Sequence, residues 1–481
     1  MLQTVKRYCR SKTSYPVAIT FFSAIFIFSD LGAGKMPPID DCYYAQKAKE
    51  IIQTGDWLTI HYAGEVSIDN APFYIWLIAL MFKFFGISEY AARFFSAFFG
   101  VATIVIIYFL GRMLFDEWIG IFSSFVLLTT QLFFIFSRRA MVDVTLTFWI
   151  TLALLFFLKG MEKKEYFLLF GMSTGIAILT KSILGFFPIL IAMVYLLLRK
   201  QFKKIMDPFF LLGIAVAFLV SLPWFFYQYI HYTENFVSGH LQWLIYERAF
   251  IINKRGTPAW FLKKLFIVYW PWIPLATYAS IRLLWRGLQK ADSGGLFILC
   301  WAGVVIGIMS CINDKKIHYI MSCFPALALL SALSLNGILG GEKRKTFFVN
   351  TVFAVLLLTA AIIITTPVTL PPRLSEDNFF EYLVDDTCSI ASFAKENLAQ
   401  EEKIILYRLW LPGIRNTYLF YSDRDISGSL DDGQLFLQTL KKGDVKYGLA
   451  TKEEYRELRE LDEFRPEILK ETESLVLFTT S

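Results

Sequence analysis

Charged side chains are scarce in this sequence. Only 18% of its 481 residues are Asp, Glu, Lys or Arg, whereas 56% are hydrophobic. A soluble domain normally carries about 25% charged and about 45–50% apolar residues, so this composition excludes an ordinary soluble domain. Several apolar runs also approach the ~20 residues that a helix needs to cross a bilayer, so we expect an α-helical polytopic membrane protein.

The sequence also lacks cysteine pairs spaced as metal ligands. The 6 cysteines are scattered, no two at a spacing typical of metal ligands, and most lie in apolar runs where a thiol behaves as a small hydrophobe. The net charge of +6 is spread over short loops, which orient helices in a membrane and indicate no nucleic-acid partner. Lys6, Arg7, Arg10 and Lys12 precede an apolar run without a small-residue cleavage site, so we expect a retained helix.

Apolar runs that suggest membrane helices recur over most of the chain. The runs are Pro16–Phe28, Phe94–Leu110, Trp118–Phe136, Val144–Leu158, Tyr166–Leu179, Ile183–Leu198, Phe209–Tyr229, Leu262–Leu284, Leu296–Ile312, Ile317–Leu339 and Phe347–Pro367. A further run, Pro72–Phe85, is ambiguous because Lys83 interrupts it and a polar loop closely precedes it.

Loop charge decides how to treat Pro72–Phe85, since Lys and Arg collect on the cytoplasmic side. If this run lies in the membrane interface, the four compact basic loops are on the same side of the membrane as the basic N-terminus. If it crosses the membrane, all four loops are on the side opposite the N-terminus. The loops contain Lys159/Lys163/Lys164, Arg199/Lys200/Lys203/Lys204, Arg282/Arg286/Lys290 and Lys343/Arg344/Lys345. We therefore predict an interfacial segment, about 11–13 transmembrane helices, a cytoplasmic N-terminus and an extracytoplasmic C-terminus.

The same parity places a second group of polar residues at the outer ends of helices. The group comprises Asp40/Asp41, Asp69, Arg138/Arg139 with Asp143, Lys181, His240 through Arg255, and Lys315 through Tyr319. A single charged residue at a membrane edge is explained by snorkelling. Acids beside bases, repeated at one face, instead indicate the wall of a polar cavity.

The composition changes after Pro371-Pro372. We divide the chain there into a transmembrane domain, residues 1–370 with a first outer loop at 30–92, and a soluble extracytoplasmic domain, residues 371–481. Apolar runs and helix-like stretches alternate in this second part, at Lys403–Tyr407, Gln434–Leu440, Tyr447–Ala450, Lys452–Leu461 and Ser474–Thr479. This alternation predicts a small α/β domain that covers the cavity, recognises the acceptor or serves as a structural cap.

The paired carboxylates Asp40 and Asp41 suit two chemical tasks. One carboxylate can act as a general base toward an acceptor hydroxyl, or the pair can hold a divalent cation against a phosphate. Basic side chains on neighbouring loops can stabilise a leaving phosphate. The structural alternative is that these acids provide the N-cap and first-turn charge of a helix over Cys42–Gln53.

An ordered series of motifs supports the chemical interpretation. It comprises Asp40-Asp41-Cys42-Tyr43-Tyr44-Ala45, Gly55-Asp56-Trp57, Ile68 through Trp76, Ser88 through Arg93, Arg139 through Asp143, Leu179-Thr180-Lys181, Leu222-Pro223-Trp224, Arg255 with Pro258 and Trp260, and Lys315 with Tyr319 and Pro325. Over roughly its first 340 residues the chain resembles the family 39 glycosyltransferases of the GT-C fold. The resemblance is to the bacterial branch that includes aminoarabinose transferases acting on lipid A, with protein O-mannosyltransferases as more distant relatives.

The resemblance implies inverting transfer from a polyprenyl-phosphate sugar at the outer face of a bacterial inner membrane, to lipid A, another cell-surface glycan or a protein. It implies Asp40 as base, with Asp41 beside it and Asp143 as a second acid. Donor phosphate would be held by Arg255 and Tyr319, with Lys315 and Lys181. Asp69, Asn70, Arg139 and His240 would line the substrate cavity, and a divalent cation, if any, would bind Asp40 and Asp41.

One residue departs from the family pattern. Asn70 stands where the family has a lysine, and Ala71 where a proline follows. Because an amide supplies no positive charge to a phosphate, Lys181, Lys315 or a metal substitutes, or activity is reduced.

Two other classes of function remain as alternatives. A transporter or flippase of a lipid-linked intermediate would line a path through the bilayer midplane with polar groups and contain inverted repeats, and the sequence displays neither. A sensor with a ligand-binding C-terminal domain would leave the outer acids unexplained.

Overall fold

The computed structural model describes residues 14–251, 257–285, 293–365, 378–409, 412–443, 445–461 and 466–479. The predicted basic N-terminal segment, Arg255 and Pro371-Pro372 lie outside these ranges. The chain divides into two compact units. The first consists of Met1–Leu31, Ile68–Tyr74 and Phe94–Thr369, and the second of Gly32–Ser67, Ile75–Arg93 and Leu370–Ser481.

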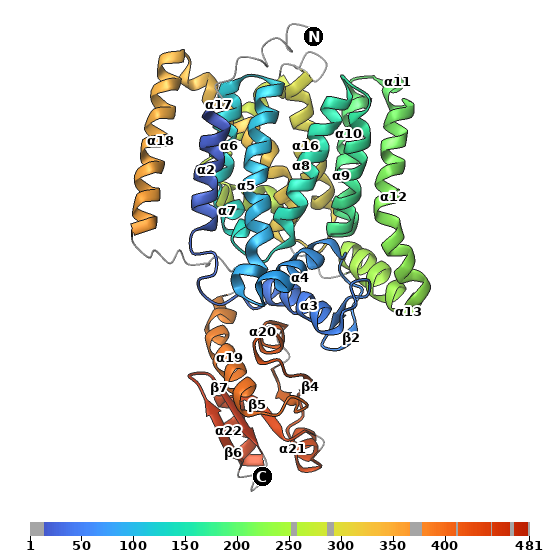
Figure 1. Cartoon of the computed structure of the whole chain (residues 1–481), viewed down its shortest axis with the longest axis vertical. Helices are drawn as coiled ribbons and strands as arrows, with labels where there is room; N and C mark the ends of the chain where they lie inside the picture. Colours follow the sequence, from blue (N-terminus) through green and yellow to red (C-terminus); the bar gives the residue numbers. More distant parts are fainter. Residues whose placement is uncertain are drawn as a thin grey trace. The chain divides into compact units, whose positions relative to one another are not determined.

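The first unit is a bundle of apolar helices (Figure 1). Its helices are α2 (Ser14–Phe28), most of α5 (Glu89–Leu114), α6 (Glu117–Leu128), α7 (Gln131–Ser137), α8 (Val142–Gly160), α9 (Tyr166–Lys181), η2 (Ser182–Phe186), α10 (Phe187–Leu198), α11 (Phe202–Ile205), α12 (Pro208–His231), α13 (Thr233–Asn235), the π-helix η3 (Phe236–Ile251), α14 (Trp260–Val268), α15 (Ile273–Trp285), α16 (Ser293–Cys311), η4 (Ile317–Cys323), α17 (Phe324–Leu339) and α18 (Glu342–Thr365).

Several of these helices satisfy the length and composition of a membrane span. Among the described residues, 6 continuous helical segments do so, or up to 7 if the bent pair α6 and α7 forms one span. The longest is an apolar segment of 33 residues, 166–198, that contains α9, η2 and α10. The chain is therefore a multi-pass membrane protein, although fewer single helices meet this length than the number of spans predicted.

The 33-residue segment folds back on itself at η2, since Lys164 before α9 pairs with Asp207 after α10. Ser182 has a φ of 32°, which ends α9, and a Cβ on Gly185 would lie 2.3 Å from the backbone nitrogen of Ile178. Only glycine allows this approach to the preceding helix. The sequence-based separation into the helices Tyr166–Leu179 and Ile183–Leu198 is thus correct.

Two predicted spans are interrupted. The run Leu262–Leu284 forms α14 and α15, which residues 269–272 separate. The run Trp118–Phe136 forms α6 and α7, whose axes differ by 69°. Thr129 and Thr130 lie at the break, and their hydroxyls donate to carbonyls of α6, each at 2.7 Å. The Thr130 amide bonds to the Leu127 carbonyl instead of the Val126 carbonyl, so the Thr130 hydroxyl satisfies the Val126 carbonyl that the break leaves without its helical donor.

Two of the predicted basic loops lie at the same end of the first unit. Lys164, between α8 and α9, forms an ion pair of 2.8 Å with Asp207, between α10 and α12. Lys204 also donates to the carbonyl of Met161 at 3.4 Å. The opposite ends of α8 and α9 carry Asp143 and Lys181, so basic loops and candidate site residues occupy different ends of these helices (Figure 1).

The second unit begins with the first outer loop. It contains α3 (Asp40–Thr54), a hairpin of β1 (His61–Tyr62) and β2 (Glu65–Val66), and most of α4 (Phe73–Phe85). The Glu50 carboxylate accepts from the turn amides of Ala63 and Gly64, at 2.8 and 3.1 Å. At about 1.5 Å per residue, α4 is too short to cross a hydrocarbon core of about 30 Å, in keeping with an interfacial segment.

The rest of the second unit is a small α/β domain. It consists of α19 (Asn378–Asn397), β3 (Ile404–Tyr407), α20 (Pro412–Ser422), β4 (Ile426–Leu430), α21 (Gly433–Lys441), β5 (Tyr447–Thr451), α22 (Lys452–Leu461), β6 (Glu467–Glu471) and β7 (Leu475–Thr479). The sheet has 5 strands in the order β4-β3-β5-β7-β6. The strands β4, β3 and β5 are parallel, and β7 pairs antiparallel with β5 and β6.

Candidate functional site

The acidic pair opens α3 in the second unit. The helix begins at Asp40, and Ile39 occupies the N-cap position without a side-chain cap. Asp41 is fully buried and Asp40 is half-buried. The N-cap part of the structural alternative is therefore wrong, because the helix starts two residues before Cys42, whereas its first-turn part is confirmed, because both acids lie in the first turn of α3. A first-turn carboxylate interacts favourably with the helix dipole, a structural contribution of about 0.3–1 kcal/mol.

In the first unit, Asp143 and Lys181 form an ion pair. Asp143 lies in the first turn of α8 and is buried, and Lys181 is the last residue of α9. Lys181 Nζ donates to Asp143 Oδ1 at 2.7 Å, whereas the buried Oδ2 atom has no hydrogen-bond partner among the described residues. A buried carboxylate oxygen without a donor is costly, so the pair keeps acceptor capacity that a substrate hydroxyl can use.

Tyr319 extends this pair. The Lys181 ammonium lies 4.9 Å from the centroid of the Tyr319 ring, and the Tyr319 hydroxyl donates to Asp314 Oδ2 at 3.3 Å. Lys315 is buried, and its ammonium donates to the carbonyl of Ile312. The structure thus brings together Asp143, Lys181 and Tyr319, while Lys315 is engaged by its own loop.

His240 links two other parts of the predicted site. Its Nδ1 atom lies 2.8 Å from the carbonyl oxygen of Ile68, and its Nε2 atom lies 3.0 Å from the Ser182 hydroxyl. The ring stacks on Phe236 at 5.4 Å. Burial lowers the pKa of His240, while the Ile68 carbonyl and the charge of Asp69 oppose that shift. A neutral imidazole therefore ties the residue before Asp69 to the residue after Lys181.

The remaining predicted site residues are Asp69, Asn70, Arg139 and Arg255. Asp69 and Asn70 are half-buried in the segment that His240 holds at Ile68. The Arg139 guanidinium lies 5.3 Å from the ring centroid of Phe136. Arg255 lies outside the described residues.

A large apolar cavity lies in the same unit. Its volume is about 920 Å³, and its walls come from α10, α14, α15, α16, α17 and the residues just before α14. Apart from the hydroxyls of Thr277, Ser280 and Ser310, the described lining is almost wholly apolar. This volume is at the upper end of the about 300–1,000 Å³ of ligand pockets, and such a lining suits a hydrocarbon chain.

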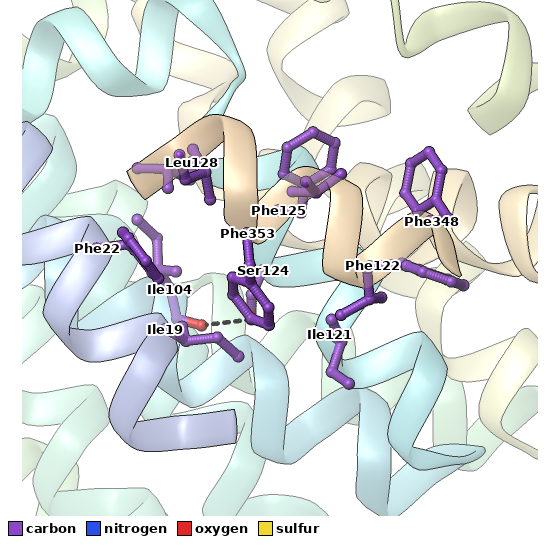
Figure 2. Close-up of a pocket in the computed structure, with 13 residues that line it drawn as sticks. Ile19, Phe22, Ile104, Ile121, Phe122, Ser124, Phe125, Leu128, Phe348 and Phe353 are labelled. Atoms are coloured by element: carbon purple, nitrogen blue, oxygen red, sulfur yellow. Dashed lines mark hydrogen bonds between the residues drawn. The ribbon is translucent and has the colours of Figure 1, made fainter. Parts of the chain in front are cut away.

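A second cavity is too small and too apolar for such a role. Its volume is about 30 Å³, and it lies among α2, α5, α6 and α18 (Figure 2). The Ser124 hydroxyl, its one polar group in Figure 2, donates to the carbonyl of Ile104 at 2.9 Å. This space is a packing gap between helices, not a binding site.

Sequence reasoning missed two members of the site. Ser182 holds the ring of His240, and Asp314 accepts from Tyr319. Asp314 directly precedes Lys315 in a polar run and could have been found there. Ser182 carries no sequence signal, because its role depends on a fold that brings η2 to η3. Within the described part of the chain, no three His, Cys, Asp or Glu side chains are grouped as a metal site.

Comparison with known proteins gives this geometry a context. Residues 69–227 match the family model described as dolichyl-phosphate-mannose-protein mannosyltransferase. An uncharacterized protein of Aquifex aeolicus is 31% identical over 316 residues, which cover 65% of this chain and 62% of that protein. An undecaprenyl phosphate-alpha-4-amino-4-deoxy-L-arabinose arabinosyl transferase of Erwinia tasmaniensis is 24% identical over 376 residues, covering 74% of this chain and 66% of that enzyme. The chain thus spans less than two thirds of the length of these curated relatives.

Solved structures share the fold. ArnT from Cupriavidus metallidurans bound to undecaprenyl phosphate superposes with a TM-score of 0.76 at 18% identity, covering 97% of this chain and 98% of ArnT. An oligosaccharyltransferase of Archaeoglobus fulgidus gives a TM-score of 0.63 at 13% identity, covering 92% of this chain and 70% of that one. The predicted resemblance to GT-C glycosyltransferases and the predicted fold class, with its small C-terminal sheet domain, are confirmed.

Proposed function

We propose that this chain is a membrane glycosyltransferase that moves a sugar from a polyprenyl-phosphate donor to an acceptor at the outer face of a bacterial inner membrane. The names of the curated relatives, and the undecaprenyl phosphate bound in ArnT, support this donor class. The relatives' names suggest 4-amino-4-deoxy-L-arabinose as the sugar, and the acceptor classes are lipid A, another cell-surface glycan or a protein.

The observation that carries the proposal is the combination of the large apolar cavity and the Asp143–Lys181–Tyr319 group in one unit. Ser310 lines the cavity near the end of α16, and the chain then runs directly through Lys315 to Tyr319. Pro258, which follows Arg255 closely in sequence, also lines the cavity. A lipid with an apolar tail and an anionic head needs both environments, and burial contributes about 0.8 kcal/mol for each CH₂ group.

The proposed reaction is a single displacement. The acceptor hydroxyl attacks the anomeric carbon, Asp40 takes the hydroxyl proton, and the bond from that carbon to the phosphate oxygen breaks with inversion. The polyprenyl phosphate leaves with the electron pair. Lys181, Tyr319 and Arg255 stabilise its developing charge, a type of contribution that is large in a water-poor site.

Lys181 also accounts for the missing family lysine. Asn70 cannot compensate a phosphate charge, but Lys181 ends α9 beside Tyr319 and forms an ion pair with Asp143 through one carboxylate oxygen. In this proposal the ammonium divides its interaction between Asp143 and the donor phosphate.

A divalent cation on Asp40 and Asp41 remains a separate proposal, which chelator treatment of the purified protein tests.

The experiment uses the purified chain in liposomes that contain labelled polyprenyl-phosphate aminoarabinose and lipid A. We expect time-dependent label in the lipid A fraction, and loss of this transfer in Lys181→Met. Movement of the labelled donor between leaflets without any transfer would support a flippase and contradict the proposal. No transfer with this donor but transfer with another polyprenyl-phosphate sugar would leave the reaction class intact and change the sugar.

A further inference from the structure

Asn416 of the C-terminal domain contacts the backbone directly before the acidic pair. It lies on α20 and is only 5% exposed. Its Nδ2 atom donates to the carbonyl oxygen of Ile39 at 2.7 Å, and its Oδ1 atom accepts from the Tyr62 hydroxyl. Both functions of one buried amide are therefore used, and the amide joins α20, the start of α3 and the β1–β2 hairpin.

The Ile39 carbonyl that Asn416 contacts lies at the N-terminus of α3, directly before the acidic pair. Ile39 is the N-cap residue of α3 and has no side-chain cap of its own. The direction in which the chain enters a helix fixes the first-turn residues, and here these are Asp40 and Asp41. A hydrogen bond to the Ile39 carbonyl therefore restrains the backbone from which Asp40 projects.

The other partner of Asn416 is also restrained. The Tyr62 ring lies 4.7 Å from the ring of Tyr43 on α3, and the Arg415 guanidinium lies 5.0 Å from its centroid. The hairpin that carries Tyr62 is held to α3 by Glu50. The Tyr62 hydroxyl thus fixes the orientation of the Asn416 amide, so that its NH₂ group faces Ile39.

The domain contacts the later part of α3 as well. Lys49 is buried and donates to the carbonyl of Phe420, at the end of α20, at 2.6 Å. Lys49 also pairs with Asp423, which Lys395 of α19 contacts at 2.5 Å. The helix α3 is therefore attached to the C-terminal domain near both of its ends.

We propose that the C-terminal domain positions the catalytic carboxylate, with Asn416 as the positioning residue that orients Asp40 through the Ile39 carbonyl and the Tyr62 hydroxyl. This inference rests on the proposed function, in which Asp40 is the base. It gives the domain a part in the chemical step, beyond covering the cavity or recognising the acceptor. Because a misplacement of about 1 Å can cost about 10²-fold in rate, one hydrogen bond can act on turnover at a distance.

The test is Asn416→Asp, which keeps the acceptor for Tyr62 and replaces the donor to Ile39 with a repelling oxygen. We expect kcat to fall about 10- to 100-fold, while the donor KM changes less than about threefold. Asn397→Asp on α19 is the matched control, because its exposed amide donates only to the Phe393 carbonyl within its own helix among the contacts described. This control should keep wild-type kcat.

A double variant separates this inference from the proposed function. If Asn416 acts through Asp40, Asn416→Asp should add no further loss to Asp40→Asn, since the effects of coupled residues are not additive. Equal, multiplying losses in the double variant would overturn the inference and leave the base intact. Normal turnover of Asp40→Asn alone would instead overturn Asp40 as the base.

Tyr62→Phe guards against a folding artefact. It leaves Asn416 unchanged but frees its amide to rotate, so kcat should fall about 3- to 10-fold, and the melting temperature should fall only slightly because one buried acceptor loses its donor. If transfer by both variants falls only in proportion to the amount of folded protein, the contact is structural and the positioning role is wrong.

Discussion

The ammonium of Lys181, the last residue of α9, lies 2.7 Å from the buried carboxylate of Asp143 in the first turn of α8. The same ammonium lies over the ring of Tyr319. One cation thus compensates a buried acid and faces an aromatic side chain at one end of the bundle. In the proposed function, this relationship couples stability and donor binding through Lys181.

Lys181→Met should impair both properties. It leaves Asp143 as a buried charge without its ammonium, which costs about 3 kcal/mol, and it removes a positive charge from the proposed phosphate site. We expect a lower melting temperature and a donor KM raised at least about tenfold. Thermal unfolding and donor titration of the same preparation measure the two effects.

The double variant Asp143→Asn/Lys181→Met should regain stability but not donor affinity. Lys164→Met is the matched control, because Lys164 also pairs with an aspartate, Asp207, near the other end of the same helices. If Lys181→Met binds donor as the wild type does, Lys181 does not contact the phosphate.

Gly307→Trp should block the apolar cavity without disturbing the protein around it. Gly307 lines the cavity, and a Cβ at this position meets nothing within 4 Å. The indole should occupy the space of the lipid tail, so KM for a long polyprenyl donor should rise at least about tenfold. KM for a donor with a short prenyl chain should change little.

Gly341→Trp serves as the control for that variant. Gly341 is exposed before α18, and a Cβ there also has open space. An equal loss of long and short donors in Gly307→Trp, or no loss of either, would mean that the tail binds elsewhere.

His240 should make stability depend on pH. Burial lowers the pKa of His240 in the folded chain below its unfolded value of about 6.5. Below pH ~6.5 the unfolded state binds the proton more readily, so the free energy of unfolding should decrease as pH falls toward the folded pKa. The melting temperature of the wild type should drop more than that of His240→Gln between pH 7.5 and 5.5.

An exposed histidine provides the comparison for that measurement. His231 ends α12 and is exposed, so His231→Gln should retain the wild-type pH dependence. Identical pH profiles for wild type and His240→Gln would show that protonation of His240 is not linked to folding.

The basic loops predict the orientation of the bundle in the membrane. Cysteines placed at the exposed positions Lys163 and Lys203 of an otherwise cysteine-free chain should react with an impermeant maleimide only from the cytoplasm. Cys311 is exposed and is the last residue of α16, just before the candidate site residues Lys315 and Tyr319. A chain that retains only this cysteine should react only from outside. Labelling of Lys163→Cys and Lys203→Cys from outside would reverse the predicted orientation.

Hydropathy predicted much of the bundle, because long apolar runs report directly on burial in lipid. It did not predict the 69° bend between α6 and α7. Thr129 and Thr130 at that bend are neither proline nor glycine, and threonine is common in membrane helices, so the break has no local signal. The hydroxyls at the bend donate to carbonyls four residues earlier, and Thr147 and Thr151 make the same contact inside the continuous helix α8, so the sequence does not distinguish the two cases.

The C-terminal sheet illustrates the same limit. The predicted strand runs correspond to β3, β5 and β7, which lie inside the sheet and have buried, continuous apolar sequences. No strand was predicted at β4 or β6, which are the edge strands and contain polar residues along exposed faces. Edge strands carry less apolar sequence because they are buried less completely.

For the candidate site, the sequence motifs identified individual residues but did not predict which of them contact one another. They identified Asp143, Lys181 and Tyr319 separately, and the fold brings them together. The role of Asn416 had no sequence signal, because 377 positions separate it from its partner Ile39. Contacts of this kind depend on tertiary structure alone.

The most direct test of the central claim is the turnover of purified Asp40→Asn. The change keeps size and hydrogen-bonding capacity, and the structure gives Asp40 a first-turn position worth only about 0.3–1 kcal/mol, so folding should be nearly unaffected. A general base contributes about 10²–10⁴-fold, so kcat for sugar transfer should fall at least a hundredfold or so, with a smaller loss in Asp41→Asn. Near-normal turnover of Asp40→Asn would contradict the account and make Asp143 the next candidate for the base.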